Sequence, residues 1–254
     1  MLGYHTRCIG LRPSGPQPAR VGSFKENVVM FRLSAHRMIA MPGIVAAAML
    51  AVFVPSHAAT PLPVPSVDAP LSNVKSVHTA VFAGGCFWGI EAVFKHVKGV
   101  TQAVSGYSGG NAETANYDAV SSGRTGHAEA VRVSYDPSRI SYGQLLRVFF
   151  SVAHDPTELN RQGPDIGSQY RSAIFFDNEE QKRVAEAYIA QLQGARAFPR
   201  AIVTRVTPLK AFYEAEDYHQ DYLARHPDQP YIVINDLPKI ADLQRQFPAL
   251  YVGK

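Results

Sequence analysis

Apolar and polar residues alternate along several short segments after residue 76, and such alternation predicts β-strands with one buried face. The first segment, Val77–Ala83, is rich in β-branched residues and ends at two glycines. The other segments that predict strands are Val100–Val104, Ala128–Tyr135, Ser172–Phe176 and Ile202–Val206.

Apolar residues recur at helical spacing in the segments between these strands. From Phe87 to Val97 they predict a helix, which Gly99 ends. Ser141–Val152 has the same spacing, and Asn178 predicts the cap of a helix that runs to about residue 192. We expect short helices at Ala215–Ala224 and Asp236–Arg245, and polar loops at Ser105–Ser122 and Ala153–Gln169.

These elements follow one another as strand–helix–strand and again as strand–helix–strand. Two such units in succession are typical of a ferredoxin-like core, in which each unit is a split βαβ. The sequence therefore predicts a single α+β domain over residues 77–254, with a ferredoxin-like split βαβ core, a mixed sheet and long loop insertions.

The N-terminal quarter of the chain has a different pattern. Residues 1–37 predict an unstructured leader extension, and residues 38–58 predict the apolar region of a signal peptide. Its unbroken apolar run, 44–54, is shorter than the ~20 residues that span a bilayer. We expect export to the periplasm with cleavage near Ala58; the alternative is a membrane anchor formed by the uncleaved segment. Residues 59–76 carry four prolines and predict an extended linker.

The formal net charge of +4 is concentrated in this N-terminal quarter. Residues 1–58 hold six basic residues and one acidic residue, so the rest of the chain has a net charge of −1. Nucleic-acid-binding domains need a basic surface. The composition therefore gives no reason to expect nucleic acid as a partner of the folded part.

The chain has two cysteines, and Cys86 is the one in the predicted domain, because Cys8 lies in the leader. Cys86 follows Gly84–Gly85 and precedes a predicted helix, so we expect it at the helix N-terminus. The positive end of the helix dipole stabilises a thiolate there. The glycine-rich turn also favours an exposed thiol. These features predict a reactive cysteine; the alternative is an inert, buried one.

Two kinds of thiol chemistry fit a reactive cysteine at this position. A hydrolase needs a histidine base nearby. The histidines of the predicted domain are His78, His96, His127, His154, His219 and His226. A redox thiol instead needs an electrophilic acceptor, an acid and an external reductant. The local pattern leaves both open. No CxxC pair accompanies His127 and Glu129, so we expect no bound metal.

The segment Gly84–Glu91 reads GGCFWGIE, and further motifs follow it in order. They are Gly106–Gly110, Asn116–Tyr117, Thr125–Val131, Tyr135–Pro137, Ile140–Tyr142, Leu145–Leu146, His154–Pro156, Arg161–Ser172 and Phe212–Gln220. In this order and spacing they resemble the methionine sulfoxide reductase A (MsrA) family over residues 77–235. Several separated motifs in the right order are more specific than any single one.

The resemblance implies a reaction and the roles of four residues in it. The thiolate of Cys86 would attack the sulfur of methionine sulfoxide, and Glu129 would supply the proton that the departing oxygen needs. An acid that donates a proton near neutral pH needs a raised pKa, which burial can provide. Tyr117 and Tyr170 would donate hydrogen bonds to the same oxygen.

The resemblance also implies a substrate and its surroundings. Phe87 and Trp88 would form an apolar wall for the methyl group on the sulfur, and Asp165 would orient neighbouring groups or water. The family reduces the S epimer of methionine sulfoxide, free or in proteins, and so repairs oxidised proteins. The products are methionine and a sulfenic acid on Cys86. No bound cofactor is implied, and we expect a monomer.

The sequence departs from the family pattern at one point. Many members carry one or two cysteines near the C-terminus, which attack the sulfenic acid and form a disulfide that thioredoxin reduces. Here the corresponding segment, Pro230–Asp236, contains no cysteine. We therefore expect a one-cysteine cycle, in which an external thiol reductant, either a thioredoxin-like protein or a small thiol, reduces Cys86 directly.

Overall fold

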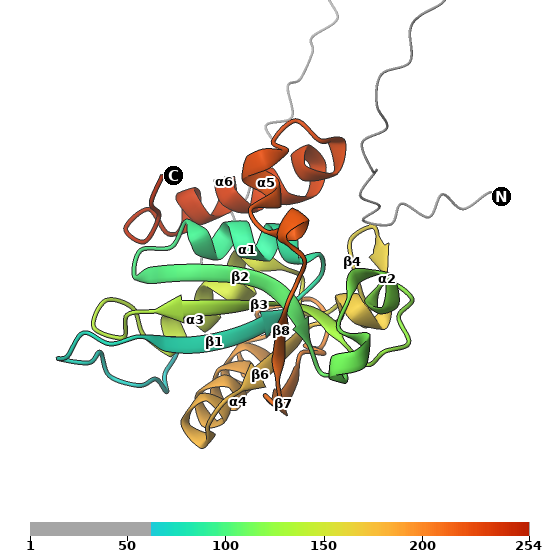
Figure 1. Cartoon of the computed structure of the whole chain (residues 1–254). Helices are drawn as coiled ribbons and strands as arrows, with labels where there is room; N and C mark the ends of the chain where they lie inside the picture. Colours follow the sequence, from blue (N-terminus) through green and yellow to red (C-terminus); the bar gives the residue numbers. More distant parts are fainter. Residues whose placement is uncertain (1–61, 254) are drawn as a thin grey trace, which may run out of the picture. The chain divides into compact units, whose positions relative to one another are not determined.

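A mixed sheet of six strands lies at the centre of the computed structural model, which describes residues 62–253 (Figure 1). The strands are β1 His78–Ala83, β2 Val100–Ser108, β3 Ala128–Tyr135, β6 Ala173–Phe176, β7 Arg205–Pro208 and β8 Phe212–Glu214. Their order is β7-β6-β1-β3-β2-β8; β6 and β7 run parallel, and the other neighbours are antiparallel. A separate hairpin pairs β4 Arg161–Gln162 with β5 Asp165–Ile166.

Six α-helices accompany the strands within residues 62–253, which confirms the predicted α+β class and mixed sheet. They are α1 Phe87–Lys95, α2 Tyr117–Val120, α3 Tyr142–Val148, α4 Glu179–Gly194, α5 Tyr222–Arg225 and α6 Leu237–Gln246. The predicted cap of α4 is present, because the side chain of Asn178 accepts a hydrogen bond from the Gln181 N–H at 2.9 Å. Ser141 and Gln144 form a capping box at the start of α3.

The main core lies between the sheet and the helices α1, α3 and α4. Phe82 of β1 points into this core and stacks on Phe94 of α1 and on Phe149, with ring centroids 5.2 and 4.9 Å away. The preceding residue, Val81, belongs to a smaller cluster on the other face of the sheet. This period of two is what the sequence pattern predicted. The packing fixes the end of β1, and with it the position of Cys86 just beyond.

The sheet extends further than the sequence predicted. Residues 105–108 were expected to form a loop, but they continue β2 and pair with the start of β3. The polar side chains there find partners inside the protein: the Ser105 hydroxyl donates to Glu91 at 3.0 Å, and that of Ser108 donates to the Ala211 carbonyl at 2.7 Å. Strand β8 was not predicted, and its three residues are too few for a periodic signal. Strand β7 begins three residues later than predicted, because the Val203 N–H bonds to the Pro156 carbonyl instead.

Two predicted helices are interrupted. The helix expected to reach residue 152 leaves the α geometry after α3 and ends in a π turn, Phe149–Ala153. The helix expected over 215–224 is a 3-10 turn, Asp217–His219, followed by α5. Between them Asp221 has a φ of 54°, and its N–H donates to the carboxylate of Glu91 at 3.2 Å. A second π turn, Ile232–Asp236, precedes α6. π turns occur often at functional sites.

Residues 62–76, the described part of the predicted linker, contain no helix or strand but contact α3 and α4. Asp68 accepts a hydrogen bond from the Gly143 N–H at 2.8 Å and another from the hydroxyl of Ser141. The Tyr188 hydroxyl of α4 donates to the Pro63 carbonyl at 2.9 Å. The segment thus adds a cap to α3 and links it to α4. The boundary of the predicted linker at residue 76 stays a prediction.

The predicted leader extension, signal segment and cleavage site all lie outside the described residues, as does Cys8. Within residues 62–253, none of the helices combines the length and the apolar character that crossing a membrane requires.

Candidate active site

Cys86 is the N-cap residue of α1, directly after β1 and two glycines, as predicted. Gly85 has a φ of +100°, which residues with a side chain rarely adopt. A Cβ at Gly84 would lie 2.7 Å from the ring of His154, and one at Gly85 would lie 2.6 Å from the side chain of Gln162. Both positions therefore require glycine, and the turn places the thiol at the positive end of α1.

The thiol is buried, with a relative exposure of 1%, so the predicted exposure is wrong. The turn before it is also covered, because His154 and Gln162, far away in the sequence, pack on the two glycines. The Gln162 amide is held in place by two hydrogen bonds with the backbone of Asp155, at 2.9 and 3.1 Å. The glycines thus admit covering side chains rather than solvent.

Glu129 of β3 lies beside the start of α1. The N–H of Phe87, the residue after Cys86, donates to Oε2 of Glu129 at 3.1 Å. Burial raises the pKa of Glu129 well above its usual value; the Phe87 hydrogen bond opposes this, and the negative charges of Asp165 and Asp236 add to it. Its second oxygen, Oε1, is buried without a hydrogen-bond partner among the described residues. The carboxyl is therefore held in its protonated form, with one oxygen available to a ligand.

Asp165 lies in the β4–β5 hairpin and is buried, with an exposure of 2%. The hydroxyl of Tyr231 donates to its Oδ2 at 2.5 Å. Burial raises the pKa of Asp165 to about 6; the Tyr231 hydrogen bond opposes the rise, the charge of Asp236 adds to it, and the charge of Lys239 opposes it. Because Asp165 also raises the pKa of Glu129, the structure brings these two predicted site residues into one electrostatic cluster.

Tyr117 is the first residue of α2, and Glu216 fixes it there. One oxygen of Glu216 accepts the Tyr117 N–H at 2.9 Å, and the other accepts the Tyr107 hydroxyl at 2.8 Å. The ring centroid of Tyr117 lies 4.4 Å from that of His219, which in turn lies 5.0 Å from that of Phe87. Tyr117, His219 and Phe87 thus form an aromatic cluster beside Cys86.

Trp88 and Phe87 are buried, with exposures of 1% and 0%. Trp88 stacks on Tyr222 with ring centroids 3.6 Å apart, and its Nε1–H donates to Nδ1 of His219 at 3.1 Å. Burial lowers the pKa of His219 to about 4, against the opposing charge of Glu216, so the imidazole stays neutral and can accept this bond. The two predicted wall residues thus form an aromatic surface next to the thiol.

Tyr170 is buried at the end of a 3-10 turn, Ser168–Tyr170, which packs on β3. The next residue, Arg171, donates to the carbonyls of Gly126 and His127 at 2.8 and 3.0 Å. Those carbonyls immediately precede β3 and lie close in sequence to Glu129. Arg171 therefore ties the turn that carries Tyr170 to the strand that carries the predicted acid.

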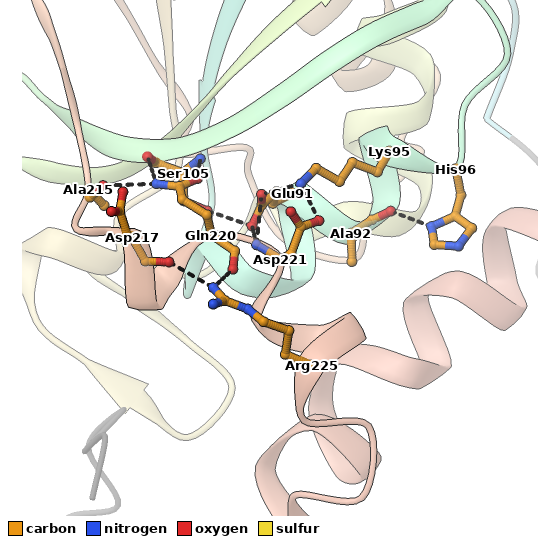
Figure 2. Close-up of polar contacts among 10 residues, drawn as sticks. All are labelled: Glu91, Ala92, Lys95, His96, Ser105, Ala215, Asp217, Gln220, Asp221 and Arg225. Carbon is orange, nitrogen blue, oxygen red and sulfur yellow. Dashed lines mark hydrogen bonds and ion pairs between the residues drawn. The ribbon is translucent and has the colours of Figure 1, made fainter. Parts of the chain in front are cut away.

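A polar network on the side of α1 facing β2 fixes the segment that carries His219 (Figure 2). The buried carboxylate of Glu91 pairs with Lys95 at 2.7 Å and accepts the Asp221 N–H, and Lys95 also pairs with Asp221. The side-chain amide of Gln220 bonds to the backbone N–H and carbonyl of Ser105, each at 3.0 Å. The network joins α1, β2 and the segment 217–221, so the aromatic cluster has a rigid support.

Two other histidines have structural surroundings. The ring Nε2 of His154 lies 2.7 Å from the Ser172 hydroxyl, and burial lowers its pKa to about 3. His127 accepts the Gly110 N–H at 3.2 Å, and its other ring nitrogen lies 2.9 Å from the Asn111 carbonyl. Within residues 62–253 there is no group of three or more histidine, cysteine, aspartate or glutamate side chains that could hold a metal ion.

Five residues that contribute to this site were not predicted to act in the reduction, although one of them, His219, was among the histidines that a hydrolase could use. They are Glu216, His219, Tyr231, Asp236 and Lys239. Glu216 and His219 lie within the last of the quoted motifs, which marked the segment without indicating what these two side chains contact. For Asp236 and Lys239 the signal was only an acid and a lysine three positions apart on a predicted helix, a spacing at which side chains are neighbours.

A thiol at a helix N-terminus, next to a carboxyl held in its protonated form, defines a class of enzyme. In this class a thiolate attacks and a buried acid protonates the group that leaves. Residues 78–250 match the family described as peptide methionine sulfoxide reductase. The chain belongs to this family.

Similar proteins agree with the assignment. The chain is 60% identical over 176 residues to peptide methionine sulfoxide reductase MsrA 2 of Mesorhizobium japonicum, covering 69% of this chain and 90% of the relative. It is 53% identical over 187 residues to MsrA 2 of Synechocystis sp., covering 74% and 87%. The solved structure of methionine sulfoxide reductase A of Corynebacterium diphtheriae is similar with a TM-score of 0.52 and 34% identity, covering 67% of this chain and 85% of that one.

Proposed function

We propose that this chain, a peptide-methionine (S)-S-oxide reductase by its family, carries out the reduction through a sulfenic acid on Cys86. The activity follows from family membership. In the proposed step the Cys86 thiolate attacks the sulfoxide sulfur, and the sulfoxide oxygen is protonated. The attack forms a bond between the two sulfurs. The protonated oxygen then passes to the cysteine sulfur as that bond and the S–O bond of the sulfoxide break, so methionine leaves reduced and the thiol becomes a sulfenic acid.

The observation that carries this proposal is the state of Glu129. A sulfoxide oxygen is a poor leaving group until it is protonated, so the reaction needs an acid that holds its proton near neutral pH. Burial raises the pKa of Glu129, Oε2 is engaged by the Phe87 N–H, and Oε1 is unpaired within the described residues. An acid for the oxygen thus lies beside the residue that follows the thiol.

The other predicted site residues have further roles around Cys86 and Glu129. The hydroxyls of Tyr117 and Tyr170 would stabilise the oxygen as negative charge develops on it. Phe87 and Trp88 supply the apolar surface for the methyl group. Asp165, which accepts a hydrogen bond from Tyr231, would orient neighbouring polar groups or water. Fixed polar and apolar sides allow the site to select one sulfoxide epimer.

The cycle closes with an external thiol. After Cys86 the given sequence contains no further cysteine, so no second thiol of this segment can attack the sulfenic acid. One external thiol would attack it and release water, and a second would free Cys86 and leave the reductant as a disulfide. A thioredoxin-like dithiol or a small thiol supplies both equivalents.

For the fold, we infer that the core is of the ferredoxin-like, split βαβ type. The support is the order β6-β1-β3-β2 of the four central strands, which are antiparallel to one another, with α1 between β1 and β2 and α3 between β3 and β6. Each strand–helix–strand unit then encloses one strand of the other unit. The remaining strands, β7 and β8, extend the two edges.

The experiment that tests the proposed function compares the two epimers of a methionine sulfoxide peptide with dithiothreitol as reductant. The wild-type chain should convert the S epimer to methionine and leave the R epimer unchanged, and Cys86→Ser should abolish the conversion. Cys8→Ser is the matched control, because that residue lies outside the family match over residues 78–250, and it should retain full activity. Turnover by Cys86→Ser, or product release without any reductant after many cycles, would contradict the proposal.

A further inference from the structure

An ion pair at the start of α6 lies against the first turn of α1. Nζ of Lys239 is 3.0 Å from Oδ1 of Asp236, three positions earlier. The Asp236 side chain has an exposure of 0% and that of Lys239 an exposure of 17%. Oδ2 of Asp236 is buried and has no hydrogen-bond partner in the described part of the chain. A buried ion pair with an unsatisfied oxygen contributes little to the stability of the fold. We therefore consider what the pair contacts.

Gly89 marks the place where this pair meets α1. A Cβ on Gly89 would lie 2.7 Å from Nζ of Lys239 and 2.8 Å from Cγ of Asp236. Gly89 follows Cys86 by three positions, and residues at this spacing on a helix are neighbours, with Cβ atoms about 5–6 Å apart. The ammonium group therefore lies against the first turn of α1, close enough to Cys86 for their charges to interact. Figure 1 shows α6 beside α1, and the two helices pack together.

The charges that face Lys239 come from three other elements. Burial lowers the pKa of Lys239, but the negative charges of Asp236, Cys86 and Asp165 outweigh it and hold the pKa above its usual value. The lysine is thus a cation that responds to the charge of the thiol. Asp165 faces it from β5, and Asp236 from the π turn before α6.

Two further titratable groups near the ion pair stay neutral. The protonated form of Glu129 is favoured, because burial and the charges of Asp165 and Asp236 raise its pKa against the opposing hydrogen bond from the Phe87 N–H. His154 is neutral because burial lowers its pKa to about 3, and the charge of Lys239 lowers it further. The charged groups around the thiol are therefore the ammonium of Lys239 and the carboxylates of Asp236 and Asp165. Asp165, with a pKa of about 6, is partly protonated near that pH.

We propose that Lys239 is a positioning residue for the reaction, whose ammonium group, held in place by Asp236, keeps Cys86 in the thiolate form. The proposal rests on the proposed function, in which this thiolate is the nucleophile. An opposite charge within about 4–6 Å lowers the pKa of an acid by about one to three units. Asp236 alone acts in the other direction, because a negative charge disfavours a second one nearby.

Lys239 and Asp236 thus shift the pKa of the thiol in opposite directions. A measurement of this pKa in variants of both residues separates the proposed role from a merely structural one. The rate of alkylation of Cys86 by iodoacetamide is measured against pH in the full chain, by mass spectrometry of the Cys86 peptide, so that Cys8 does not contribute. Only the thiolate reacts, and the inflection of the profile reports the pKa of the thiol. The variants are Lys239→Met, Lys239→Arg and Asp236→Asn, with Lys182→Met on α4 as the matched control.

We expect Lys239→Met to move the inflection upward and to slow alkylation at a pH below it by about tenfold or more. Lys239→Arg keeps the charge and should retain most of the wild-type profile. Asp236→Asn removes a negative charge, while the amide oxygen can still accept the hydrogen bond from Nζ of Lys239, so it should move the inflection downward. Lys182→Met should change nothing. An unchanged inflection in Lys239→Met, or shifts of the same sign in Lys239→Met and Asp236→Asn, would overturn the proposal. Alkylation needs no sulfoxide, so this outcome is separate from a failure of the proposed function, which wild-type turnover reports.

Discussion

The substitution Glu129→Gln removes the proposed acid while changing little else. Burial and the charges of Asp165 and Asp236 hold Glu129 protonated, so the substitution replaces one neutral group by another of the same shape. The amide oxygen of glutamine can accept the Phe87 N–H in place of Oε2. We therefore expect the fold and the binding of substrate to be preserved, and the change to fall on kcat.

The expected magnitude follows from what the acid supplies. A positioned general acid contributes about 10²–10⁴-fold to a rate, which corresponds to about 3–5 kcal/mol of transition-state free energy. Because Glu129 is 1% exposed, water has little access to replace its proton, which favours the upper half of this range. The hydroxyls of Tyr117 and Tyr170 remain, so some activity should persist.

The assay is the initial rate of methionine formation from the S epimer with dithiothreitol, measured against pH. In the wild type, kcat should fall at alkaline pH as Glu129 loses its proton, and this alkaline limb should vanish in Glu129→Gln together with most of the rate. Glu129→Asp, the matched control, keeps an ionisable acid and should keep the limb. A kcat for Glu129→Gln within tenfold of wild type, with the limb intact, would refute the role of this residue.

Two further predictions follow from the surroundings of the site, and a third follows from the predicted signal peptide. Gly89→Ala should lower the free energy of unfolding by about 1–3 kcal/mol in a urea titration, because its Cβ collides with Asp236, whereas Gly194→Ala, with no atom within 4 Å, should not destabilise. His154→Gln should flatten the pH dependence of unfolding between pH 3 and 6.5. The wild-type imidazole, neutral in the fold, contributes stability that is complete above pH 6.5 and lost as the pH falls, at up to ~1.4 kcal/mol per pH unit. N-terminal sequencing of the exported protein should begin after Ala58, and an intact Met1 would contradict cleavage.

The predictable part of the structure was the part encoded by local pattern. Alternation over β1, the two glycines and the helical spacing after Phe87 placed Cys86 at the start of α1, and the structure confirms it. The burial of the thiol could not be predicted in this way, because the side chains that pack on the turn before it, His154 and Gln162, follow more than 60 residues later. Contacts at such separation leave no trace in a periodic pattern.

The same reasoning explains the other differences. Ser105 looked like a loop residue because it is polar, yet its hydroxyl is satisfied by Glu91 of α1, and the strand continues through it. The interruption before α5 depends on Asp221 turning toward the same carboxylate. Tyr117 could be chosen among twelve tyrosines only through the family resemblance, since its position depends on Glu216, a residue 99 positions away.

The central claim is that Cys86 alone takes the oxygen from the sulfoxide, and a single turnover without reductant tests it most directly. The enzyme is mixed with one equivalent of the S-sulfoxide peptide, and the Cys86 peptide is examined by mass spectrometry with a reagent specific for sulfenic acids. We predict one methionine per enzyme and a mass increase of one oxygen atom on Cys86, which the reagent traps. A disulfide that includes Cys86, or a full yield of methionine with Cys86 unmodified, would contradict the account.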